Sequence, residues 1–168
     1  MNRQITDREY LYIVQDILEH QEFQRLSSIT HHGNNRYDHS VRVSFWSYRV
    51  SKLFRLDYDR VARAALLHDF FFEENEGTDK KTRTTVLVKH PQYALENACR
   101  YFELSDMEKD IIATHMFPVN LRVPKYLESW IVDLVDDIVA VYEKTYILRK
   151  QLSTSVSFMF IILLNYLR

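Results

Sequence analysis

The sequence predicts an all-α fold, a single-domain bundle of six or seven helices, on three observations. The 168 residues are 46% hydrophobic and 27% charged, which is enough apolar material for one buried core. Apolar side chains recur at helical spacing along most of the chain. Glycine occurs only twice and proline three times, whereas folds built from many strands and tight turns need more of both. Gly33 and Gly77 also lie too far apart to form a glycine-rich phosphate loop.

The first predicted helix spans residues 6–26. Its start, TDRE, matches a capping box in which Thr6 caps the first turn and Glu9 closes the box. A polar linker follows over 27–38, and a second helix is expected over 39–54. On that helix the side chains expected to face the core are the apolar ones: Val41, Phe45, Tyr48, Leu53 and Phe54.

The third predicted helix spans residues 58–70. It is rich in alanine and almost entirely apolar after Arg63, which is typical of a helix at the centre of a bundle. The polar segment 72–89 is expected to be an irregular loop, and long loops of this kind are often functional. Pro91 suits the first turn of the next helix, over 91–102.

The last third of the chain predicts two more helices and an apolar end. Ser105 and Glu108 form a second capping box, and a long helix is expected over 124–150. The run VSFMFIILL dominates residues 151–168, which we expect to form a buried terminal helix. This run is well short of the roughly 20 apolar residues that span a bilayer. An interface between copies of the chain, through residues 156–167, is the alternative.

Charge and cysteine content narrow the function classes. The 22 basic and 23 acidic residues give a net charge of −1, so the whole protein has no field that would hold a nucleic acid duplex. The single cysteine, Cys99, cannot form an internal disulfide, and the segment MNRQITDREY lacks the apolar core of a signal peptide. We therefore expect a cytoplasmic protein that binds neither duplex nucleic acid nor a membrane.

Four of the seven histidines stand where a metal site could be built. His39 begins a predicted helix, His90 precedes a proline at a helix start, and His115 lies near a helix end. The fourth, His68, is followed by Asp69 within the apolar stretch AALLHDFFF, where both polar groups need a partner that offsets their burial. A metal cation is such a partner, and imidazole with carboxylate suits Mn, Fe, Co, Ni or Zn.

Acidic residues on the long C-terminal helix are further candidate ligands. Asp133, Asp136 and Asp137 interrupt the apolar stretch WIVDLVDDIVAVY, where a bare carboxylate is costly. Only one face of the helix can point inward, so the three carboxylates cannot all be ligands.

In its order, this set of residues resembles the HD superfamily of metal-dependent phosphohydrolases, in the version with two additional histidines that hold a second metal. The resemblance rests on the R-x-x-H start at 36–39, the AALLHD run at 64–69, the His90-Pro91 helix start and the stretch LVDDIVA. It extends over about residues 36–142. It implies a helical bundle of the HD-domain type, and we expect residues 1–168 to form one such domain.

The resemblance implies two divalent transition-metal ions held by six residues: His39, His68, Asp69, His90, His115 and Asp136. It places His39, His68, Asp69 and Asp136 around one ion, with Asp69 bridging to a second ion held by His90 and His115. A carboxylate can bridge two cations because it has two oxygens, whereas an imidazole cannot. The dyad of His68 and Asp69 is therefore the expected catalytic centre, where two ions would activate a shared hydroxide for attack on phosphorus. Asp133 and Asp137 are reserves for Asp136, with a solvated or capping role as the favoured interpretation.

Charged residues near the dyad are the candidate substrate contacts: Arg36, Lys80, Lys81, Arg83 and Glu73. Fixed cations suit a phosphate group, and Glu73 could protonate a leaving group or orient water. Nucleotidases and alarmone hydrolases, which this chain resembles as members of that family, carry an H-D-x-x-E pattern. Here three phenylalanines separate the dyad from Glu73, so their catalytic glutamate does not transfer directly.

The leading hypothesis is a two-metal phosphohydrolase that cleaves a phosphate ester or anhydride of a nucleotide or another small phosphorylated molecule. One alternative is an HD-like di-iron oxygenase that uses the same six ligands. The other is a non-catalytic module that binds a nucleotide or a metal. The identity of the metal, oxygen uptake and turnover of phosphoesters distinguish the three.

Overall fold

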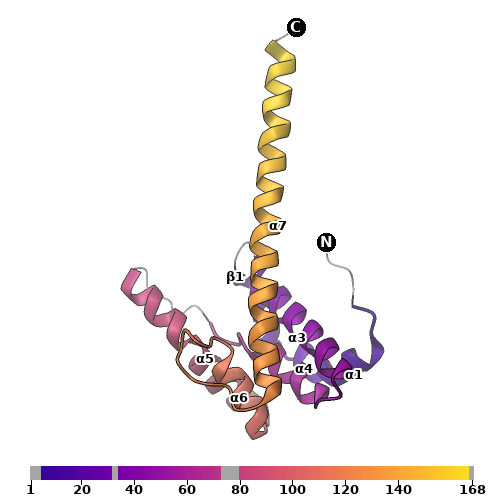
Figure 1. Cartoon of the computed structure of the whole chain (residues 1–168), viewed down its shortest axis with the longest axis vertical. Coiled ribbons are helices and arrows are strands. Elements are labelled where there is room, and N and C mark those ends of the chain that lie inside the picture. The colour runs from indigo at the N-terminus through magenta and orange to yellow at the C-terminus, as the bar shows by residue number, and fades with distance from the viewer. Residues whose placement is uncertain (1–4, 32–33, 73–79, 167–168) are drawn as a thin grey trace.

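A computed structural model of the chain describes residues 5–31, 34–72 and 80–166. Within these ranges it leaves out the side chains of residues 30–31, 34, 80–87 and 150–166. The described residues form seven α-helices, a short 3-10 helix and one pair of two-residue strands, so the prediction of an all-α fold is confirmed (Figure 1). The strand pair, β1 (Thr30–His31) with β2 (Asn34–Asn35), is antiparallel.

The N-terminal segment is divided into three short helices, and the single helix expected over 6–26 is wrong. Helix α1 (Arg8–Leu18) is followed by α2 (Gln21–Gln24) and the 3-10 helix η1 (Arg25–Ser28). The division occurs at His20, whose backbone is extended with a ψ of 126°. The cap of α1 is Asp7 rather than Thr6, because the Asp7 carboxylate accepts the backbone N–H groups of Glu9 and Tyr10.

Helix α3 (Arg36–Leu53) begins three residues before the predicted start, capped by Asn35, whose side chain accepts the N–H of Asp38. Of the side chains expected to face the core, Tyr48 is buried and Val41 and Phe45 pack partly buried against the core. The expectation is wrong for Leu53 and Phe54, which are 77% and 64% exposed. Four serines also line the buried face: Ser40, Ser44, Ser47 and Ser51. These short side chains allow α3 to approach α4 closely, and the Ser44 hydroxyl donates to the Ala62 carbonyl at 2.6 Å.

Helix α4 (Tyr58–Leu67) lies at the centre of the bundle, as the sequence predicts. It packs against α1, α3 and α6, and also touches α5 and α7. Its buried side chains are Val61, Ala62, Ala64, Ala65, Leu66 and Leu67. The helix ends at Leu67. His68 and Asp69 follow it directly and are therefore also buried at the centre of the bundle.

The irregular loop predicted over 72–89 is wrong for residues 80–89, which belong to helix α5 (Lys80–Tyr101), and residues 73–79 lie outside the described residues. Residues 80–89 are helical, and Pro91 lies inside α5 rather than in its first turn. A proline removes only one hydrogen bond of a helix, and the stretch before it contains no glycine or other proline that would end the helix. Helix α6 (Asp106–Thr114) begins with the predicted capping box, in which the Ser105 N–H donates to Glu108 Oε2 at 2.8 Å.

Helix α7 (Leu127–Tyr166) is one helix of 40 residues, so the apolar terminal segment continues it instead of forming a helix of its own. Its first part packs against α3 and α6, and the rest runs out beyond the bundle (Figure 1). The side chains from residue 150 onward lie outside the description, so the expected burial of the terminal run stays a prediction. Among the described helices, none combines the length and the apolar character that crossing a membrane requires.

Candidate metal centre

The dyad after α4 carries a buried imidazole nitrogen that faces two carboxylates. Nδ1 of His68 lies 2.7 Å from the Ala65 carbonyl, which can only accept, so Nδ1 carries the proton and Nε2 has a free lone pair. Nε2 is buried and has no hydrogen-bond partner among the described residues. It lies 3.6 Å from Oδ1 of Asp136 and 3.9 Å from Oδ2 of Asp69. A cation placed between these atoms would satisfy all three.

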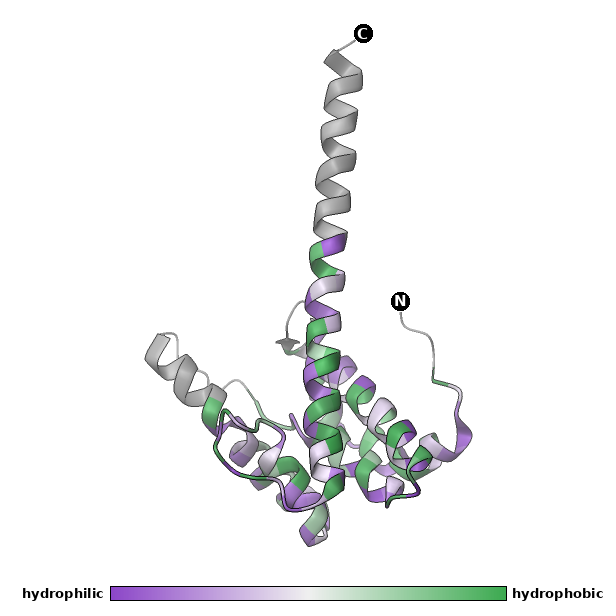
Figure 2. Ribbon diagram, viewed as in Figure 1, coloured by the Kyte–Doolittle hydropathy of each residue, from purple (hydrophilic) through white to green (hydrophobic). Residues whose placement is uncertain are grey.

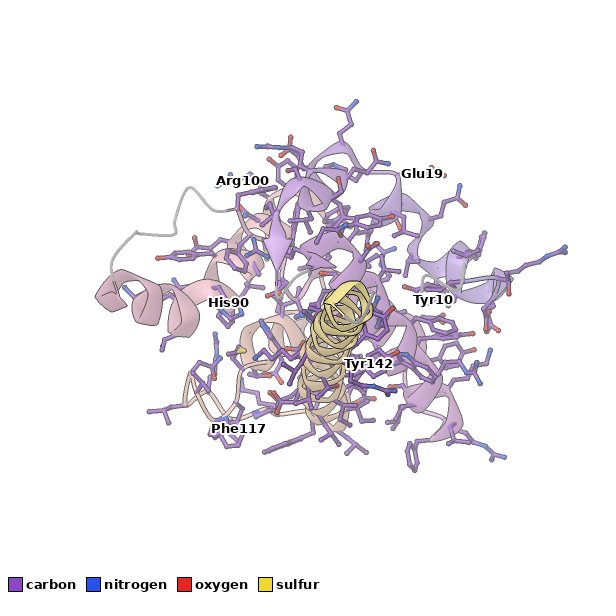
Figure 3. All side chains as sticks on the ribbon, turned by 90° about the horizontal axis from the view of Figure 1, so that it is seen from above. Tyr10, Glu19, His90, Arg100, Phe117 and Tyr142 are labelled. Carbon is purple, nitrogen blue, oxygen red and sulfur yellow. The ribbon has the colours of Figure 1, made fainter. Side chains whose placement is uncertain are left out.

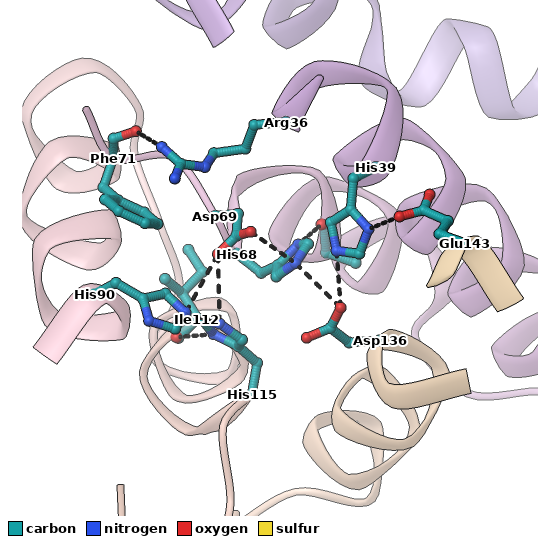
Figure 4. Close-up of polar contacts among 11 residues, drawn as sticks. Arg36, His39, His68, Asp69, Phe71, His90, Ile112, His115, Asp136 and Glu143 are labelled. Carbon is teal, nitrogen blue, oxygen red and sulfur yellow. Dashed lines mark hydrogen bonds and ion pairs between the residues drawn. The ribbon is translucent and has the colours of Figure 1, made fainter. Parts of the chain in front are cut away.

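His39 and Asp136 complete the first cluster of candidate ligands, here called the His39 cluster (His39, His68, Asp136). His39 comes from the first turns of α3 and Asp136 from α7, and Nε2 of His39 lies 2.9 Å from Asp136 Oδ1. Figure 4 shows the three side chains converging beside Asp69. Ligand atoms of His39, His68 and Asp69 lie within 4.8 Å of one another.

His90 and His115 form the second cluster, here called the His90 cluster, on the other side of Asp69. Their Nε2 atoms lie 3.3 Å and 3.7 Å from Asp69 Oδ1, and 2.9 Å from each other. Nδ1 of His115 lies 2.9 Å from the Ile112 carbonyl, so the proton is on Nδ1 and Nε2 has the lone pair. Seen from above, His90 and Tyr10 lie on opposite sides of α7 (Figure 3).

Asp69 stands between the two clusters. Its Oδ1 faces His90 and His115, whereas its Oδ2 faces His68. This placement brings together all six residues that the sequence singles out as ligands, from five different helices or their ends. The two-sided position of the carboxylate is what a bridge between two cations requires, and it supports that predicted role.

The electrostatics of the His39 cluster favour positive charge. Burial alone would lower the pKa values of His39 and His68, but the nearby carboxylates, Asp136 and Asp69, raise both above the usual value. Burial of Asp136 likewise opposes its ionisation, yet His68 and His39 hold its pKa well below the usual range. The cluster therefore stabilises an ionised carboxylate together with a cation in an apolar surrounding.

The His90 cluster behaves differently. Burial, followed by the charges of His68 and His90, lowers the pKa of His115 to about 3. Its imidazole is therefore neutral over the whole physiological range, which is the form that binds a metal.

Glu143, which the sequence analysis missed, holds His39 from behind. It is buried on α7, its Oε2 lies 3.0 Å from Nδ1 of His39, and it forms an ion pair with Arg42. A carboxylate at this position keeps the proton on Nδ1 and directs Nε2 toward the ligand site. The sequence spacing could have identified Glu143, because it lies seven residues after Asp136 and hence on the same face of the helix.

The structure distinguishes the three aspartates of α7. Asp136 alone among them points into the ligand set, whereas Asp133 accepts the Phe117 N–H at 3.1 Å and Asp137 is exposed. Burial, with the charge of Asp137 second, raises the pKa of Asp133 to about 7. Of the two roles expected for the alternatives to Asp136, the capping role therefore fits Asp133 and the solvated role fits Asp137.

Arg36, a predicted phosphate contact, is buried beside the dyad. Its guanidinium donates to the Phe71 carbonyl at 2.7 Å and lies over the Phe71 ring, 3.8 Å from the centroid (Figure 4). These contacts fix the segment that follows Asp69, and the contact with phosphate stays a prediction. Of the other predicted substrate contacts, Lys80, Lys81 and Arg83 lie on the first turn of α5 with side chains outside the description, and Glu73 lies outside the described residues.

Comparison with known proteins gives one match. The family model described as the HD domain matches residues 36–141, which is more than half of the chain and includes all six candidate ligands. Neither a curated protein nor a solved structure matches the chain.

Proposed function

This chain belongs to the HD-domain family, whose members are generally metal-dependent hydrolases, and on that premise we propose that it is a two-metal phosphohydrolase. Its substrate would be a phosphate ester or anhydride of a small phosphorylated molecule, with a nucleotide as the preferred class. The observation that carries the proposal is the position of Asp69, with one carboxylate oxygen toward each histidine cluster.

The residues present fit two divalent transition metals. Imidazole nitrogens and carboxylate oxygens together suit Mn, Fe, Co, Ni or Zn. The buried Nε2 of His68, which has no hydrogen-bond partner among the described residues, is a ligand atom ready for a cation. His39, His68, Asp69 and Asp136 would hold one ion, and Asp69, His90 and His115 the other. Such ions, when bound, lower the pKa of water and neutralise charge on a phosphate group.

The protein's own residues orient the ligand histidines and keep bulk water out of this site. The carbonyls of Ala65 and Ile112 and the carboxylate of Glu143 fix the tautomers of three ligand histidines. All six ligand side chains are buried, which excludes bulk water and strengthens the electrostatic interactions within the site.

The charge balance also favours an anionic substrate. Two carboxylates with two divalent cations leave a net positive site, and Arg36 lies beside it. A phosphate group matches that charge. The di-iron oxygenase would use the same ligands, so the metal and the reaction have to be identified together.

The test is metal content and turnover of the wild-type protein, purified without chelators, beside Asp69→Ala. We expect close to two metal equivalents and hydrolysis of a panel of nucleotides and other phosphoesters, with both lost in Asp69→Ala. Asp59→Asn, an exposed aspartate of α4, is the matched control and should retain both.

Other outcomes would overturn the proposal. Tightly bound iron with dioxygen uptake, and no phosphoester turnover, would indicate the oxygenase. A wild-type protein that takes up no Mn, Fe, Co, Ni or Zn would indicate a binding module without this chemistry.

A further inference from the structure

One face of α7 points away from the bundle and is apolar. Large side chains along it are exposed, and Leu127, Leu134, Ile138, Val141 and Leu148 each leave more than half of their surface in water. Figure 2 shows hydrophobic residues along the described part of this helix. The opposite face of the same helix carries Asp136 and Glu143 into the bundle. A hydrophobic strip of this length is costly when it faces solvent.

The spacing of the strip is that of a helix that pairs with another helix. Leu127, Leu134, Val141 and Leu148 recur every seven residues. A second set, Ile138 and Thr145, is exposed, recurs with the same period and lies four residues after members of the first. Ile131 continues this second set but packs partly buried against the core of the bundle. Two interleaved sets at this spacing form the seam of a two-helix coiled coil. We call the six exposed residues of the two sets the α7 strip.

The charges beside the α7 strip select the direction of pairing. Asp137 and Lys144 lie on one flank, and Glu128 and Arg149 on the other. When two identical helices pair antiparallel, like flanks meet. Asp137 then meets Lys144 of the second copy, and Glu128 meets Arg149, each twice. A parallel pair in register would instead bring Lys144 of each copy against Arg149 of the other.

We propose that two copies of this chain form a dimer in which their α7 helices pack antiparallel through the α7 strip. In the register that the charges select, Ile138 of one copy lies opposite Val141 of the other, and Thr145 opposite Leu134. A second copy is the occupant that the residues specify, because the strip complements itself in both apolar spacing and charge. This dimer does not depend on the proposed function.

The dimer has a consequence for the metal centre. The helix that pairs outward through the strip carries Asp136 and Glu143 on its inner face. Pairing would therefore brace the helix that supplies a ligand and the carboxylate behind His39. Of the residues predicted from the sequence as an interface, 156–167, those up to 166 continue the same helix beyond the strip.

The first test is the mass of the full-length protein by sedimentation equilibrium. We expect about twice the chain mass of 20.3 kDa at micromolar concentration. Leu134→Glu with Val141→Glu should weaken the dimer at least about 100-fold, because each copy loses two buried apolar side chains. Leu53→Glu, at an exposed leucine on α3, is the control and should stay dimeric.

The second test is the direction of pairing. Asp137→Lys and Lys144→Glu, each alone, place like charges opposite each other in an antiparallel dimer and should weaken it. An equimolar mixture of the two variants restores both opposite-charge pairs and should form a heterodimer. Cross-linking gives an independent readout in a Cys99→Ser background, in which chains with Leu134→Cys and chains with Thr145→Cys should form a disulfide only when mixed.

Three outcomes would overturn the proposal. They are a monomeric wild-type protein at about 100 μM, a dimer unaffected by the double glutamate variant, and disulfide formation by Leu134→Cys chains alone, which indicates parallel helices. A monomer would leave the strip for a different protein partner.

Discussion

The two histidine clusters that share Asp69 contain the same kinds of ligand but hold charge differently. His68 and His115 are both buried, and both donate Nδ1–H to a backbone carbonyl. Yet the pKa of His68 is raised, whereas that of His115 is lowered to about 3. The difference lies in the balance of neighbouring charges. Burial lowers the pKa of both imidazoles, but Asp69 and Asp136 outweigh it at His68, whereas at His115 burial and the charges of His68 and His90 outweigh the same two carboxylates. Burial alone therefore does not decide the charge of an imidazole, because the charged groups around it also act.

This comparison predicts unequal metal affinities. In the His39 cluster, Asp136 contacts His39 at 2.9 Å and Glu143 lies behind His39, so this cluster should bind its ion more tightly. In the His90 cluster, Asp69 is the carboxylate grouped with both histidines, whereas Asp136 is grouped with His115 and not with His90. Four experiments test this difference between the clusters, and they follow in order of decreasing expected effect.

The largest effect is expected from Asp136→Ala compared with His115→Ala. Removing Asp136 should empty the tighter site and lower turnover about 10³-fold, since a metal contributes several kcal/mol to the transition state. Removing His115 should leave one ion bound and lower turnover about 10²-fold. Metal content and kcat measured on the same samples give the answer. Equal loss of both ions in both variants would contradict separate affinities.

The metal-free protein should show opposite pH dependence in the two clusters. Because the pKa of His115 is lowered in the folded protein, the unfolded chain binds a proton there at a pH where the folded protein does not. The free energy of unfolding therefore decreases as pH falls below 6.5. In chelator, His115→Gln should therefore gain about 2 kcal/mol over the wild type between pH 6.5 and 5. The raised pKa of His39 acts with the other sign, because its stabilisation is present below the unfolded pKa and lost as pH rises through the folded one.

Urea unfolding at several pH values measures both effects. His39→Gln should be most destabilised relative to the wild type at pH 5 and least at pH 8. Parallel pH profiles for the two variants would show that the clusters do not differ in charge.

Glu143→Gln should weaken only the first ion. Loss of the carboxylate behind a ligand histidine typically lowers metal affinity by about 10-fold to 100-fold. Competition with a chromophoric chelator measures both binding constants, and the second should stay unchanged. Glu96→Gln, an exposed glutamate of α5, serves as the control. An equal decrease in the two binding constants would mean that Glu143 stabilises the fold in general and does not act specifically through His39.

The smallest effect is expected outside both clusters, at the exposed ion pair of Asp16 with Arg63. Arg63 donates to both oxygens of Asp16, at 2.6 and 2.8 Å, and this hydrogen bond lowers the pKa of Asp16. Asp16→Asn should cost about 0.5 kcal/mol of unfolding free energy, because solvent screens an exposed pair. The difference should disappear as pH falls below about 4, where the unfolded chain takes up the proton. A change in metal content would be unexpected.

Local sequence patterns were sufficient where the deciding interactions are local. The capping box of Ser105 with Glu108 lies within one helical turn, and it is present in the structure. The apolar composition of residues 58–70 correctly predicts the central helix, although the helix ends three residues earlier, at Leu67. Local patterns failed where tertiary packing decides, as at Pro91 inside α5 and at Leu53 and Phe54, which were expected to face the core and are exposed.

The sequence alone was sufficient to predict the all-α fold, because helical spacing is recorded along the chain. Polar residues in apolar runs marked candidate ligands, and the resemblance to the HD superfamily selected six of them. Only the tertiary structure decided which atoms meet. It placed Nε2 of His39 against Asp136, 97 residues away, and Glu143 behind the same ring, 104 residues away. It also turned the two oxygens of Asp69 toward different clusters. Such contacts join separate helices, and their geometry depends on how side chains pack between them, which no local spacing specifies.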